Sequence, residues 1–198
     1  MIIIGGIKMK KSVFGTKEIV TCAVLLAICI ASQFFKNLSV FITGPIINAC
    51  LVLAVLTVGL AGGIILSIVT PVTAYIIAAS RVMTDVPLII PFIMAGNVVL
   101  VLATNFLLKK DLEHGKGLRD IKSYIKAVIC SALKGLFMGL TISLWLLPTF
   151  IPAESPLLKK IPVFQTMFSV TQFVTACIGF VYAFIIWAAL GRFLIKGE

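Results

Sequence analysis

The sequence has little of what catalysis requires. Among 198 residues only seven are acidic and one is a histidine, His114, which lies in a charged segment. An intramembrane protease or a metalloenzyme needs a nucleophile with a base, or a cluster of ligands, within its site. We therefore expect no catalytic residue, no metal site and no cofactor. The acidic residues all lie between apolar runs or at their ends: Glu18, Asp85, Asp111, Glu113, Asp120, Glu154 and Glu198.

The usual means of powering transport are also missing. Proton-coupled carriers keep a carboxylate or a histidine inside the membrane as a relay, and no such residue lies deep in an apolar run. No glycine-rich loop followed by Lys-Ser or Lys-Thr occurs, so the chain lacks that ATPase motif. The cysteines fall within apolar runs and predict small core residues, not a disulfide framework: Cys22, Cys29, Cys50, Cys130 and Cys177.

Apolar residues fill the chain instead. They make up 61% of it and charged residues 12%, whereas a soluble domain is about half apolar and a quarter charged. The runs are continuous and do not alternate, which indicates helices, not barrel strands. We expect an all-α integral membrane protein, one domain over residues 1–198, with six transmembrane helices in a compact bundle. The expected helices cover residues 17–35, 42–58, 60–79, 86–108, 122–147 and 163–194.

The net charge of +10 is explained by topology, not by nucleic-acid binding. If both termini are cytoplasmic, most basic residues lie on the cytoplasmic side, as the positive-inside bias requires. Lys36, Arg81, Lys159 and Lys160 then lie outside. We expect a multi-pass protein of a bacterial plasma membrane. The cytoplasmic groups are Lys8, Lys10, Lys11 and Lys17, then Lys109, Lys110, Lys116, Arg119 and Lys122, then Arg192 and Lys196.

The connections between the runs differ in character. The outer loops cover residues 36–41, 80–85 and 148–162, and the third has four prolines, a composition that predicts a structured cap and no continuing helix. The inner connections are a tight turn at residues 59–63, which predicts a hairpin of helices two and three, and a charged loop at residues 109–120.

Lys134 is the most unusual residue, because it lies near the middle of the fifth run. A charge there costs about 2.5–3.5 kcal/mol on insertion scales. Either the side chain snorkels or donates to backbone carbonyls, or it neutralises an anionic group of a ligand. Asn97 and Gln172 lie at a similar depth on the fourth and sixth helices. They serve either interhelical hydrogen bonding or, with Lys134, a binding site.

Residues near the outer ends have two interpretations as well. Trp145 and Phe164 fit an interfacial aromatic belt or a wall on which a ring-containing ligand stacks. Arg81 either pairs with Asp85 or attracts an anion. We include Arg81, Trp145 and Phe164 among the candidate binding residues.

Small residues recur every four positions on the first helix, at Ala23, Ala27 and Ala31. Such a stripe lets another helix approach closely, and close packing drives helix association in lipid. Gly135 and Gly139 repeat the spacing on the fifth helix, where packing within the bundle explains it.

The chain resembles the substrate-binding S component of energy-coupling factor (ECF) vitamin transporters. The shared features are a basic N-terminus, this alanine stripe, the tight hairpin, and prolines near the starts of helices four and six. The resemblance covers the whole chain. It implies that Ala23, Ala27 and Ala31 contact a transmembrane coupling protein and that two cytoplasmic ATPases supply energy. It places the vitamin toward the outer face, between loops one, three and five and helices four to six. The family shares no ligand-binding motif, so depth and charge alone single out the polar residues above.

We therefore predict a substrate-specific binding subunit of an ATP-driven importer for a vitamin or vitamin precursor that bears a carboxylate or another anion. Lys134 would hold the anion, Asn97 and Gln172 would hydrogen-bond the rest, and Arg81 with the proline-rich loop would gate access. The alternative is a stand-alone passive facilitator or an anion-selective channel with Lys134 in the pore. A purely structural subunit would leave the buried lysine unexplained.

Overall fold

The computed structural model describes residues 3–4, 7–8, 14–35, 39–113, 120–152 and 154–195. Six of its helical stretches are long and apolar enough to cross a membrane, which confirms the all-helical prediction and indicates a multi-pass membrane protein. Some residues considered above lie outside the described part, namely Lys10, Lys11, Lys36, His114, Lys116, Arg119, Lys196 and Glu198.

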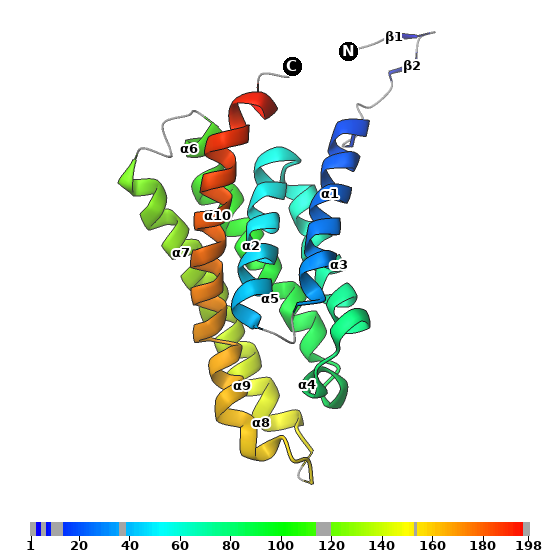
Figure 1. Cartoon of the computed structure of the whole chain (residues 1–198), viewed down its shortest axis with the longest axis vertical. Coiled ribbons are helices and arrows are strands. Elements are labelled where there is room, and N and C mark those ends of the chain that lie inside the picture. The colour runs from blue at the N-terminus through cyan, green and yellow to red at the C-terminus, as the bar shows by residue number, and fades with distance from the viewer. Residues whose placement is uncertain are drawn as a thin grey trace.

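The elements follow one another along the chain as Figure 1 shows. A short antiparallel pair, β1 (Ile3–Ile4) and β2 (Ile7–Lys8), precedes the helices. The helices are α1 (Thr16–Gln33), α2 (Val40–Thr57), α3 (Leu60–Ala78), α4 (Arg81–Asp85), α5 (Ile89–Ala103), the π-helical η1 (Thr104–Leu108), α6 (Lys109–Glu113), α7 (Ile121–Met138), the π-helical η2 (Gly139–Leu146), α8 (Leu147–Phe150), the 3₁₀ helix η3 (Leu158–Lys160), α9 (Ile161–Met167) and α10 (Val170–Ile195).

Helix α2 is the centre of the bundle. It packs against α1, α3, α5 and α10, and further contacts join α1 to α3, α3 to α5, α5 to α7 and α7 to α10. Its residues from Ala49 to Leu56 are each at most 7% exposed, because this helix is apolar on all sides and can be surrounded by protein. A polar residue on α2 therefore faces other helices and not lipid.

The hairpin of α2 and α3 forms as predicted, with two residues between the helices. Gly59 adopts φ +96° there and is the one described residue with positive φ. Only glycine takes this conformation without steric cost. The turn accordingly reverses the chain within a few residues.

Both ends of the helical part lie at the same end of the bundle. Helix α1 begins and α10 ends at the top of Figure 1, whereas α4, α8 and α9 lie at the bottom. Six crossings require this arrangement whichever side is cytoplasmic. The cytoplasmic assignment of the termini stays a prediction.

Three expected connections are wrong in detail. Residues 80–85 are not a simple loop, because α4 forms there with Val82 and Met83 buried and Arg81 exposed. The fifth helical stretch continues through Pro148, which is tolerated at the start of α8 because a first-turn residue needs no N–H partner. The charged inner loop is shorter than expected, since residues 109–113 are the helix α6.

The sixth stretch is also not one continuous helix. It breaks at Phe168 and Ser169, between α9 and α10. The Ser169 N–H donates to the Thr166 carbonyl, three residues back, at 3.4 Å, so the chain leaves α9 in a turn tighter than an α-helical one. The break places both α9 and the first turn of α10 beside one cavity.

Candidate functional site

Lys134 lies inside the bundle. It is 13 residues after the start of α7, about 20 Å along the helix at about 1.5 Å per residue, and its side chain is 2% exposed. A residue this buried neither snorkels nor reaches the lipid-facing surface. Its charge must be compensated by neighbours or by a ligand.

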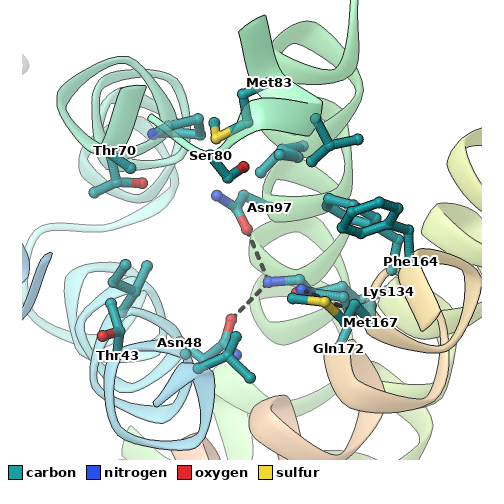
Figure 2. A pocket seen from close by; sticks show the side chains of 18 residues that line it. Thr43, Asn48, Thr70, Ser80, Met83, Asn97, Lys134, Phe164, Met167 and Gln172 are labelled. Atoms are coloured by element: carbon teal, nitrogen blue, oxygen red, sulfur yellow. Dashed lines mark hydrogen bonds between the residues drawn. The ribbon is translucent and has the colours of Figure 1, made fainter. Parts of the chain in front are cut away.

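Two asparagines hold the ammonium group. Lys134 Nζ donates to Asn48 Oδ1 at 2.6 Å and to Asn97 Oδ1 at 2.8 Å, as the dashed lines in Figure 2 show. An ammonium has three donors, and no described residue accepts from the third. No described carboxylate pairs with this lysine either. The amide dipoles solvate the charge in part but leave it without a counterion.

Close packing of the backbones brings the asparagines to this position. A Cβ atom on Gly179 of α10 would lie 2.6 Å from Asn48 Cβ, and one on Gly96 of α5 would lie 2.5 Å from Met138 Cγ. Both glycines therefore allow helix contacts that a larger residue would prevent. Asn48 is 2% exposed and Asn97 4%, so both amides are committed to the interior.

A cavity of about 190 Å³ opens beside Lys134. Its walls come from α2, α3, α4, α5, α7, α9 and α10; of these, α4 and α9 lie at the end of the bundle away from the chain termini in Figure 1. Figure 2 shows the side chains that line it. Most of the lining is apolar. Representative apolar residues are Ile47, Pro71, Met83, Phe164, Met167 and Phe168.

Four of the predicted binding residues line this cavity: Asn97, Lys134, Phe164 and Gln172. The depth argument is right for the pair that hydrogen-bonds, Asn97 and Lys134. Gln172 lies in the same wall, but its Nε2 donates to the Met167 carbonyl at 3.4 Å and not to another lining side chain.

The other two candidates do not line it. Arg81 is on the exposed side of α4, and no ion pair joins it to Asp85 within the described residues. Asp85 instead accepts from Thr84 at 3.4 Å and from Ser155 at 3.3 Å. Trp145 is 52% exposed, and its ring meets two phenylalanines edge-on, with centroids 5.7 and 5.8 Å away. Its exposed position fits the interfacial-belt interpretation.

Sequence reasoning missed Asn48 and Thr70 as lining residues. Asn48 is a polar residue inside an apolar run, eight residues after the start of α2, so the rule that singled out Asn97 applies to it equally. Thr70 carries no such signal, because a threonine in an apolar helix usually bonds its own backbone. Only the packing of α3 shows that it faces the cavity.

The alanine stripe faces outward. Ala23, Ala27 and Ala31 are all exposed on α1, which is the least buried of the six stretches. Within the described chain no other helix covers this face. The stripe is thus available for lipid or for a partner helix.

The polar groups around Lys134 are amides and hydroxyls. The described residues contain no group of three or more metal-ligating side chains. The chain matches no protein-family model, no curated protein sequence and no solved structure.

Proposed function

We propose that this chain is the substrate-binding subunit of an ATP-driven importer for a small micronutrient, a vitamin or vitamin precursor, that bears a carboxylate or another anionic group. The observation that carries the proposal is the ammonium of Lys134. It is buried beside a cavity, has one donor without a protein acceptor, and has no acidic partner among the described residues.

Electrostatics favours an anionic ligand. A buried charge is stable only when it is paired and hydrogen-bonded, and two neutral amides meet this requirement only in part. A carboxylate in the cavity would complete the pair in a region of low dielectric, where opposite charges attract strongly. The same field would disfavour a cationic ligand.

The source of energy would be external to this chain. The resemblance to ECF S components implies a transmembrane coupling protein and two cytoplasmic ATPases. The outward-facing stripe of Ala23, Ala27 and Ala31 supports such a contact, since small residues let a partner helix pack closely in lipid. Reorientation of the subunit against that partner would release the ligand inside.

A channel or passive facilitator is less well supported by the packing. A pore needs a polar or hydrated path through the whole bundle. Beyond the cavity, however, the described residues of the half near the termini include many buried apolar side chains. These are Leu51, Val52, Val55, Leu100, Val101 and Leu108, each at most 1% exposed.

Two measurements on the purified protein test the proposal. One ligand per chain at submicromolar affinity, detected by native mass spectrometry and calorimetry, supports a binding subunit. Flux of anions into liposomes that contain this chain alone, without ATPases, would contradict it and favour the facilitator.

A further inference from the structure

We infer that the ligand is a carboxylate built on a single ring, with an N–H or O–H donor on the side of the ring away from the carboxylate. This inference rests on the proposed function and names the ligand class more narrowly. Three features of the cavity carry it: its size, the donors at one wall and an acceptor at another.

The size suits a ligand of about one ring. The cavity measures about 190 Å³, only slightly more than the cavity of about 150 Å³ that binds benzene in another protein. Pockets for drug-sized molecules begin at about 300 Å³. Ring faces and flexible thioethers in the lining, from Phe164, Phe168, Met83 and Met167, suit a flat apolar body.

The donor wall is formed by Lys134 and Asn97. Because Asn97 Oδ1 accepts from Lys134 Nζ, the Nδ2 group must point the other way, and Figure 2 shows it on the side of Thr70 and Ser80. No described residue accepts from Nδ2, although Asn97 is only 4% exposed. One ammonium N–H and one amide N–H thus have no described acceptor, and both favour an anionic group on the ligand.

The acceptor is the hydroxyl oxygen of Thr70 on α3. Its proton is donated to the Leu66 carbonyl at 2.8 Å, so only lone pairs remain for a ligand. Thr70 is 1% exposed and lines the cavity, and in Figure 2 its oxygen is directed to the interior of the site. A ligand donor at this position would make a hydrogen bond, whereas a carboxylate there would meet lone pairs.

Thr43, although it lines the same cavity, does not offer an equivalent acceptor at the centre. Its hydroxyl donates to the Ser32 carbonyl of α1 at 3.1 Å, and Figure 2 shows the oxygen turned away from Lys134. It therefore provides a matched control. A valine at Thr43 removes the same hydroxyl from the same cavity lining without removing the proposed ligand contact.

The test uses simple one-ring probes on the full-length protein in nanodiscs, by calorimetry. We expect 4-aminobenzoate or 3-aminobenzoate to bind about tenfold more tightly than benzoate, since a net hydrogen bond of this kind is worth about one order of magnitude. Benzamide and the two-ring biphenyl-4-carboxylate should bind at least tenfold more weakly than benzoate. Thr70→Val should reduce aminobenzoate affinity to that of benzoate and leave benzoate unchanged, and Thr43→Val should preserve the difference.

Equal binding of benzoate and benzamide, tight binding of the two-ring probe, or an unchanged aminobenzoate preference in Thr70→Val would overturn the inference. If no probe binds, the compound that co-purifies with the protein is extracted and identified by mass spectrometry. A one-ring carboxylate with a ring donor supports the inference. A larger or uncharged compound overturns it and leaves the binding function standing. No bound compound and no binding of any probe would contradict both.

Discussion

Replacing Lys134 by methionine tests whether this lysine binds the ligand or only stabilises the fold. Methionine is unbranched and fills a similar space, so the change removes the charge and the donors with little change in packing. If the ligand is an anion held by Nζ, the loss of binding free energy should equal that for truncating one partner of a buried charge pair, about 2–5 kcal/mol. That corresponds to about a 30-fold to several thousand-fold rise in Kd.

Stability of the ligand-free protein should change less than ligand affinity, because two contributions oppose each other. The substitution removes hydrogen bonds from Lys134 to Asn48 and Asn97, each worth about 1.5–3 kcal/mol when one group is charged. It also removes the cost of placing a charge at mid-depth, about 2.5–3.5 kcal/mol. Together the two bonds are worth about 3–6 kcal/mol, so the net change is a loss of at most about 3.5 kcal/mol. At about 2–4 °C per kcal/mol for a chain of this length, we expect the Tm to fall by no more than about 14 °C.

The assay is titration calorimetry with the compound recovered from the purified protein, together with a thermal melt of the ligand-free form. Lys126→Met is the matched control, because Lys126 is on the same helix but pairs with Asp111 at a partly exposed position. A pair of that kind contributes at most about 1 kcal/mol. Affinity within twofold of the unchanged protein in Lys134→Met, with a large fall in Tm, would refute the reasoning and make the lysine structural.

Three further changes test other parts of the structure. Ala27→Phe should abolish ATP-dependent uptake by the assembled transporter but leave equilibrium ligand binding intact. The control Ala189→Phe, at an exposed position of α10, should preserve both uptake and binding. Loss of binding in a folded Ala27→Phe protein would show that this face has another role. Gly179→Ala should lower the Tm and weaken ligand binding, because the added Cβ would lie 2.6 Å from Asn48 Cβ. Overpacking of this kind costs about 1–3 kcal/mol. An unchanged Tm by thermal melt would show that α10 can shift freely. Arg81→Gln should change the Kd measured by calorimetry less than twofold, since this exposed side chain does not line the cavity; a tenfold loss would return Arg81 to the site.

Local sequence patterns were sufficient to predict the six apolar helical stretches and to place one polar pair, Lys134 and Asn97, at the same depth. Hydropathy over about 20 residues identifies an apolar helix because backbone groups in lipid must bond within their own segment. Charge at mid-depth singled out Lys134, and counting residues along two helices placed Asn97 at the same level. These properties follow from composition and from the helical rise per residue alone.

The interruptions were harder to predict. The sixth stretch breaks at Phe168 and Ser169, whereas the fifth continues as α8 past Pro148. Hydropathy does not distinguish these cases from a continuous helix or a loop. Residues on either side of the break, Met167 and Gln172, line the cavity.

The amino-acid order of this chain was enough to establish six apolar helices, a hairpin at Gly59 and a charged residue at mid-depth, because each depends on residues close together along the chain. The partners of that charge were decided only by the packing of the bundle. Asn48 and Thr70 reach the cavity because α2 is surrounded by other helices and α3 turns one face inward, and glycines set how closely the helices approach. Which faces meet is a property of all the helices together, and no single segment specifies it.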